Sequence, residues 1–271
     1  MSVYKKDGMQ VGAVYRLDGT QILDYAYRLD GSEIPLANFR PTAVVSQLGS
    51  IKISGIKQGG CTDGTYIYQT CGDTANYTYL DILKYKISDG TYTTKHFVQS
   101  EVDFGHANDM TYNPNNNRLY IPTMYADGSV IVLNASDLSY VETLTIINAN
   151  GNPFRCWQLC FNRDTNEFLS PANTKVYFYD QNLHLLRSVD IPPLPDGYDW
   201  QSAETDGEFI YRLAYPNSVF VYTVSGDYVA TIALPISGEA ESIMYDWHGH
   251  FYIGKYTMGN ETDLFYSVIL S

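Results

Sequence analysis

The chain has 271 residues and a formal net charge of −13 at pH 7; its composition is 45% hydrophobic and 14% aromatic, with 25 tyrosines. Aromatic residues suit the half-buried surface of a β-sheet, so this composition favours an all-β protein. The acidic charge would repel a phosphate backbone, which argues against nucleic acid as a partner. No apolar run approaches the roughly 20 residues of a membrane span. The first ten residues lack the apolar stretch of a signal peptide, so we expect synthesis in the cytoplasm and no membrane insertion.

Residues 1–40 differ from the rest and are predicted to form a separate segment. They contain three Tyr-x-x-Asp-Gly stretches, which begin at Tyr4, Tyr15 and Tyr27. Each Asp-Gly supplies the positive-φ turn that a tight β-hairpin requires. A segment this short has no core of its own. It is expected to cap the remaining domain, residues 41–271, as hairpins, or to attach that domain to another protein or to a second copy.

Residues 41–271 repeat one β-unit five times. The centre of the unit is a turn followed by an apolar strand, and its best copies are "QGGCTDGTYIY" from Gln58 and "QSAETDGEFIY" from Gln201. The equivalent strand positions are Tyr66, Leu119, Phe168, Phe209 and Phe251, at spacings of 53, 49, 41 and 42 residues. This is the period of a propeller blade of four antiparallel strands. The sequence therefore predicts a five-bladed β-propeller.

The fifth unit ends early, with the strand "LFYSVILS". An open ring would leave strand edges unpaired, so a propeller commonly closes with a strand from the other end of the chain. The candidates lie between Thr42 and Gly55, in "TAVVSQLG" and "SIKISG". One of them is expected to supply the missing outer strand.

The four cysteines, Cys61, Cys71, Cys156 and Cys160, are too few and too irregularly spaced for a disulfide framework or a zinc site. We expect buried thiols in a reducing compartment. A bridge between Cys61 and Cys71, across neighbouring strands, is the alternative.

The residues at the start of the inner strands of a propeller surround its axis and form a funnel. Polar and aromatic residues gather at these positions, and they are the predicted ligand-binding set: Gln58, His106, Asn108, Asp109, Arg155, Trp157, Trp200, Gln201, Glu239 and Glu241. The tryptophans offer flat surfaces on which a sugar ring can stack while polar neighbours bind its hydroxyl groups. In the alternative interpretation, Asn108 and Asp109 bond backbone amides and hold the blades together.

Acidic residues at the same positions permit two further interpretations. Asp109, Glu204 and Glu241 could supply the oxygen ligands of a Ca²⁺ site. The same three residues with Glu239 could act as acid and base in a glycosidase or a lyase. Solvated carboxylates, or carboxylates paired with Arg155, are the simplest alternative, so the sequence assigns no catalytic residue and requires no cofactor.

Two stretches resemble known proteins. "GHANDMTYN" followed by "NRLYI", and "GEAESIMYDWHGHFYI", are similar to small five-bladed propellers of Gram-positive bacteria and their phages, including the helveticin-J-like class, over residues 58–271. The Tyr-x-x-Asp-Gly stretches look like the short repeats of phage tail and baseplate accessory proteins. The resemblance implies a structural or cell-surface-binding role, with a surface glycan as ligand and association with a virion or similar particle. It transfers no catalytic residue.

Three functional hypotheses follow. The first is a non-enzymatic module that recognises a carbohydrate or another surface ligand through the funnel. The second is a glycosidase or lyase, and the third is a protein–protein scaffold. A propeller can host all three. A shallow face with an exposed tryptophan would favour binding, and a deep funnel with two close carboxyl groups would favour hydrolysis.

Overall fold

The computed structural model describes residues 43–52, 55–72, 78–256 and 262–270, together with the backbone of four short strands between residues 4 and 35. Every described element is a β-strand. In this part of the chain there is no helix of the length and apolarity needed to cross a membrane. The chain divides into two compact units, Met1–Pro41 and Thr42–Ser271.

The first unit contains a small antiparallel sheet. Its strands pair in chain order: β1 (Tyr4–Lys6), β2 (Met9–Val11), β3 (Tyr25–Arg28) and β4 (Glu33–Pro35). Lys6 pairs with Met9, so only Asp7 and Gly8 separate the strands of the first hairpin. The stretch that begins at Tyr15 lies outside the described residues.

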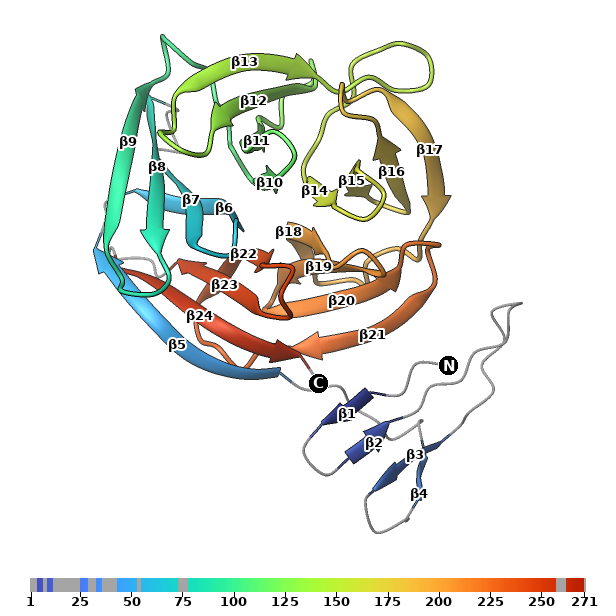
Figure 1. The fold of residues 1–271 in the computed structure, drawn as a ribbon. Helices are drawn as coiled ribbons and strands as arrows, with labels where there is room; N and C mark the ends of the chain where they lie inside the picture. Colours follow the sequence, from blue (N-terminus) through green and yellow to red (C-terminus); the bar gives the residue numbers. More distant parts are fainter. Residues whose placement is uncertain are drawn as a thin grey trace. The chain divides into compact units, whose positions relative to one another are not determined.

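The second unit is a propeller of five four-stranded antiparallel sheets around a common axis (Figure 1). Blade one consists of β6 (Ile56–Thr62), β7 (Tyr66–Gly72), β8 (Tyr79–Lys86) and β9 (Tyr92–Val98). Blade two consists of β10 (Thr111–Asn113), β11 (Arg118–Pro122), β12 (Ser129–Asn134) and β13 (Tyr140–Thr145). Blade three consists of β14 (Cys160–Asn162), β15 (Glu167–Ala172), β16 (Lys175–Tyr179) and β17 (Leu185–Asp190). Blade four consists of β18 (Asp199–Thr205), β19 (Phe209–Tyr215), β20 (Ser218–Thr223) and β21 (Tyr228–Ala233).

Blade five is built from both ends of the unit, which confirms the predicted closure. Its strands are β22 (Glu239–Tyr245), β23 (Phe251–Tyr256), β24 (Thr262–Leu270) and β5 (Ala43–Lys52). β5, drawn in blue, lies along β24, drawn in red, and pairs with it from Lys52 opposite Thr262 to Ala43 opposite Leu270 (Figure 1). One strand thus runs through both candidate segments, and the ring has no open edge at this position.

Neighbouring blades pack face to face through apolar clusters, and each of the five contacts between described blades has its own cluster. Aromatic pairs lie at the centre of several of them. The rings of Tyr120 and Phe168 are 4.6 Å apart between blades two and three, and those of Tyr85 and Phe265 are 5.1 Å apart between blades one and five. Each large apolar side chain that is fully buried contributes about 1.5–3 kcal/mol. The core therefore forms a ring around the axis, and the axis itself is lined by polar residues.

Candidate functional site

Three of the five inner strands carry a β-bulge at the same height. In β6 the extra residue falls at Gln58–Gly59, in β18 at Gln201–Ser202 and in β22 at Glu241. A bulge interrupts the alternation of a strand and re-aims side chains, and bulges are frequent next to functional sites. The bulges therefore determine which polar side chains reach the axis at this level.

Glu241 shows the effect of its bulge most clearly. On one side of β22, Ala240 and Ile243 pack in the cluster between blades four and five. On the other side, Met244 packs in the cluster between blades five and one. Glu241 is the extra residue between these two faces. It is only 3% exposed.

The carboxyl group of Glu241 has an unusual electrostatic environment. Burial raises its pKa to about 9, with a further contribution from the negative charge of Glu239, and no hydrogen bond from a described residue opposes the shift. Glu241 is therefore protonated and neutral at pH 7. A neutral buried carboxyl can donate as well as accept a hydrogen bond.

A chain of hydrogen bonds joins four blades at the mouth of the hub. The Asn108 amide donates to the Gln201 carbonyl at 2.6 Å and to the Trp157 carbonyl at 3.2 Å. The Gln201 side-chain amide in turn donates to Glu239 Oε1 at 2.7 Å. These four residues, all predicted from the sequence as ligand-binding, are thus brought together from blades two, three, four and five.

Trp157 is the exposed aromatic residue of this group. It is 42% exposed, and the Arg155 guanidinium lies 4.9 Å from the centre of its ring. Arg155 Nε also donates to the Met124 carbonyl at 2.5 Å, which holds the guanidinium in place. The Arg155 guanidinium therefore lies over one face of the Trp157 ring.

Trp200, the other predicted stacking residue, lies elsewhere. Its ring packs in the cluster between blades three and four, against Phe220 and under the Arg212 guanidinium at 3.2 Å. His106 is half-buried, and burial lowers its pKa, so its ring is neutral at pH 7. Gln58 is 8% exposed, and its buried Oε1 has no hydrogen-bond partner among the described residues.

Asp109 lies inside the hub, below the mouth. Its carboxylate accepts hydrogen bonds from the backbone amides of Leu159 at 3.0 Å and Ala203 at 3.1 Å, and from Ser202 Oγ at 2.8 Å. It also accepts from its own neighbour, the Met110 amide, at 3.0 Å. Burial nevertheless raises the pKa of Asp109 to about 7. The side chain has no exposed surface and ties blade two to blades three and four, as the structural interpretation of this residue expects.

The calcium site considered from the sequence is not formed. Within the described residues, no three His, Cys, Asp or Glu side chains come together in a way that could hold a metal ion. The reason is that the acids lie at different depths. The Glu204 carboxyl accepts from the Thr205 amide at 2.8 Å and has Asp109 and Arg163 as its charged neighbours, whereas Glu241 has Glu239. Glu239 and Glu241 are therefore the acidic pair at the mouth.

Sequence reasoning missed a group of buried polar residues between blades three and four. The Arg212 guanidinium, fully buried, donates to Gln158 Oε1 at 2.9 and 3.0 Å, and the Gln158 amide donates to the Ser202 carbonyl at 2.9 Å. The sequence feature that could have indicated this group is Arg212 itself, a charged residue inside the apolar strand "FIYRLAY" of β19. Arg212 and Gln158 thus form a buried polar contact between blades four and three.

Gly59 is required where β6 passes the Asp109 segment. A Cβ atom at Gly59 would lie 2.3 Å from the backbone of Asp109. We expect Gly59→Ala to lower the free energy of unfolding by about 3 kcal/mol, because neither backbone can move away cheaply. Chemical denaturation measures this, with Ser188→Ala on the exposed strand β17 as the control, expected within about 0.5 kcal/mol. Equal stability of the two variants would contradict the close packing of the hub.

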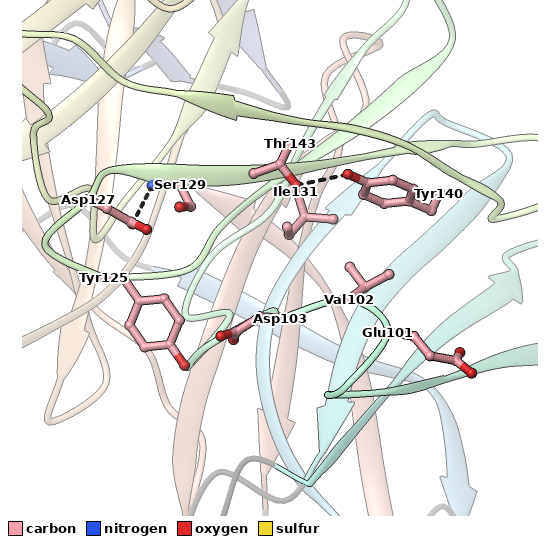
Figure 2. Close-up of a pocket in the computed structure, with 9 residues that line it drawn as sticks. All are labelled: Glu101, Val102, Asp103, Tyr125, Asp127, Ser129, Ile131, Tyr140 and Thr143. Atoms are coloured by element: carbon pink, nitrogen blue, oxygen red, sulfur yellow. Dashed lines mark hydrogen bonds between the residues drawn. The ribbon is translucent and has the colours of Figure 1, made fainter.

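A cavity of about 210 Å³ lies away from the axis, between blades one and two. Its wall combines the segment after β9 with the outer strands of blade two, as Figure 2 shows. The lining residues are Glu101, Val102, Asp103, Tyr125, Asp127, Ser129, Ile131, Tyr140 and Thr143. The sequence did not indicate this cavity, because its walls come from two separate repeats.

The four cysteines are free and buried, so the alternative of a Cys61–Cys71 bridge is wrong. Burial raises the pKa values of Cys61, Cys156 and Cys160. Protonated, inaccessible thiols are unreactive. The cysteines therefore act as small apolar residues.

Comparisons with known proteins identify the architecture. No family model matches the sequence, and no curated protein matches it. The crystal structure of Myxococcus xanthus glutaminyl cyclase is similar, with a TM-score of 0.60 and 12% identity over 86% of this chain and 99% of that one. At this identity the likeness shows the fold alone. The chain is thus a five-bladed β-propeller, and its fold is shared with an enzyme.

Proposed function

We propose that this protein is a carbohydrate-binding propeller whose ligand rests on Trp157 at the mouth of the hub. The supporting observation is an exposed tryptophan, with Arg155 beside it, next to the polar groups of Asn108, Gln201 and Glu239. A sugar has an apolar C–H face that stacks on an aromatic ring, and a rim of hydroxyl groups that such polar groups bind.

The exposure of Trp157 supports binding at the surface of the mouth. In this proposal the ligand is a surface glycan, and the sheet β1–β4 attaches the propeller to a larger particle, a partner protein or a second copy. The attachment role rests on the sequence resemblance of the Tyr-x-x-Asp-Gly stretches to phage tail and baseplate accessory proteins. The acidic charge of −13 favours neutral or cationic glycans over phosphate-rich ones.

A glycan array followed by titration calorimetry tests the proposal through Trp157→Ala. Loss of the stacking surface is expected to weaken binding about tenfold, close to the upper range for an aromatic contact. Tyr228→Ala is the matched control, because Tyr228 is 50% exposed but lies on the outer strand β21. Binding that is unchanged in Trp157→Ala would place the ligand elsewhere. Failure of every glycan to bind would favour the scaffold hypothesis.

A second candidate is an enzyme that uses Glu239 and Glu241 for proton transfer. The observation that favours it is the raised pKa of Glu241 beside a second carboxyl group, an arrangement that can supply an acid and a base. The likeness to a glutaminyl cyclase is consistent with catalysis on this architecture. If the protein cleaves a glycan that it binds, Glu241→Gln is expected to abolish cleavage while leaving binding detectable. Chromatography of the incubated glycan decides between the two.

A further inference from the structure

At two bulge residues a side-chain oxygen forms no hydrogen bond with a described residue, and at Gln58 that oxygen is fully buried. Glu241 receives no hydrogen bond from a described residue, and Gln58 Oε1 has no partner there either. Leaving a buried polar group unsatisfied costs about 1–3 kcal/mol, and folded proteins nearly always avoid it. Both side chains belong to bulge residues of neighbouring inner strands. The two together indicate a position where a ligand supplies the missing hydrogen bonds.

The chemistry of this position is acidic. Glu239 and Glu241 are two residues apart on β22, and neither forms an ion pair with a described Lys, Arg or His. Two lysines of the inner two strands of blades one and five, Lys57 and Lys255, have other oxygen atoms as their hydrogen-bond partners. The Lys57 ammonium donates to the Gly55 carbonyl at 2.6 Å, and that of Lys255 lies 3.4 Å from Ser237 Oγ.

The Arg155 guanidinium covers Trp157, and the half-buried His106 is neutral. None of the charged groups around the mouth therefore neutralises the carboxyl pair. Gln201 occupies only one oxygen of Glu239, so acceptor positions remain on both acids.

We infer that this acidic pair holds an ammonium group, and that the ligand of the propeller is a glycan carrying a free amino sugar. The inference rests on the proposed function, because the sugar ring is held by Trp157. An ammonium group supplies three donors and one positive charge, which suits two carboxyl groups and the free oxygen of Gln58. A Ca²⁺ ion would require six to eight oxygen ligands. The described residues do not assemble even three suitable acidic, His or Cys side chains.

Binding of the ammonium group has a proton balance that can be measured. The free protein carries a proton on Glu241 at pH 7, because burial and Glu239 raise its pKa to about 9. A neighbouring positive charge stabilises the carboxylate, so Glu241 loses its proton as the amino sugar binds. The proton goes to solvent at a pH below the pKa of the amine, where the sugar already carries its charge, and the titration is run there. No covalent bond forms or breaks. A neutral N-acetylated sugar offers no such charge and leaves the proton in place.

Titration calorimetry with chitosan tetramer and its fully N-acetylated counterpart tests the inference. The titration is done at physiological ionic strength, which screens the net charge of the protein. We expect the chitosan tetramer, which carries free amino groups, to bind at least tenfold more tightly than the N-acetylated tetramer. Repeating the titration in buffers of different ionisation enthalpy is expected to show proton release with the amine alone. In Glu241→Gln both the preference and the proton release are lost, and the N-acetylated tetramer still binds. Glu208→Gln, an exposed acid beyond the far end of β18, retains both.

The outcomes separate the two claims. Equal affinity for the two tetramers, or a preference that survives in Glu241→Gln, overturns the inference and leaves carbohydrate binding intact. A preference that is also lost in Glu208→Gln would reflect general attraction to an acidic surface and overturns it too. Failure of both tetramers and of every arrayed glycan to bind overturns the proposed function, and the inference with it.

Discussion

Asp109→Ala is expected to lower the free energy of unfolding by at least about 3 kcal/mol, because it removes one acceptor from several buried donors at once. The amides of Leu159 and Ala203 and the hydroxyl of Ser202 would then have no partner from blade two. Since these donors belong to blades three and four, the loss weakens three blades together. Urea denaturation followed by tryptophan fluorescence measures the change.

The control for this variant is Asp196→Ala, which removes an exposed carboxyl group from the loop before β18. We expect it to stay within about 0.5 kcal/mol of the unsubstituted protein. A loss in Asp109→Ala no larger than in the control would mean that water replaces the carboxylate in the hub. The hub would then be open rather than filled.

Stability is expected to fall as the pH rises from 5 to 9. Burial raises the pKa values of Asp109, Glu204 and Glu241 to about 7, 8 and 9. A carboxyl group whose pKa is higher in the folded state contributes its full stabilisation below its unfolded pKa. That contribution is lost as the pH rises through the folded-state pKa. Each such group steepens the decline by up to about 1.4 kcal/mol per pH unit between its two pKa values.

Glu241→Gln removes the ionisable group with the highest of these three pKa values, and with it the largest expected loss of stability on raising the pH. The variant removes the ionisable group without removing a hydrogen bond between described residues, so it is expected to be the more stable protein at pH 9. At pH 5 the two proteins are expected to be similar. Denaturation midpoints across this pH range provide the measurement, with Glu208→Gln as the exposed control. Parallel curves for the Glu241 variant and the unsubstituted protein would show that Glu241 is hydrated.

The propeller was predictable because its determinants are local and periodic. Turn residues at regular spacing mark the strands, and Tyr66, Phe209 and Phe251 each begin the second strand of a blade. Closure was predictable for a different reason, since a last unit that lacks one strand must find it in the remaining chain. The expectations based on resemblance, a phage or Gram-positive origin and a surface ligand, stay predictions.

The site was predictable only in part. The sequence predicted that polar residues gather at the mouth of the hub, and hydrogen bonds in the structure join four of them: Asn108, Trp157, Gln201 and Glu239. It did not distinguish Trp157 from Trp200, because both stand at the start of an inner strand. Their exposure depends on which side chains of the folded blades pack against them. Arg212 and Phe220 cover Trp200, whereas Trp157 stays open to solvent.

The amino-acid sequence alone determined the number of blades, the strand that closes the ring and the acidic, polar character of its hub. Only the tertiary structure decided which acids share the mouth and which are sealed inside. The physical reason is that burial and hydrogen bonding depend on which neighbouring blades meet each side chain, and the sequence of one strand does not contain this information. Glu241 forms no hydrogen bond with a described residue, whereas the carboxylate of Asp109 accepts hydrogen bonds from blades two, three and four.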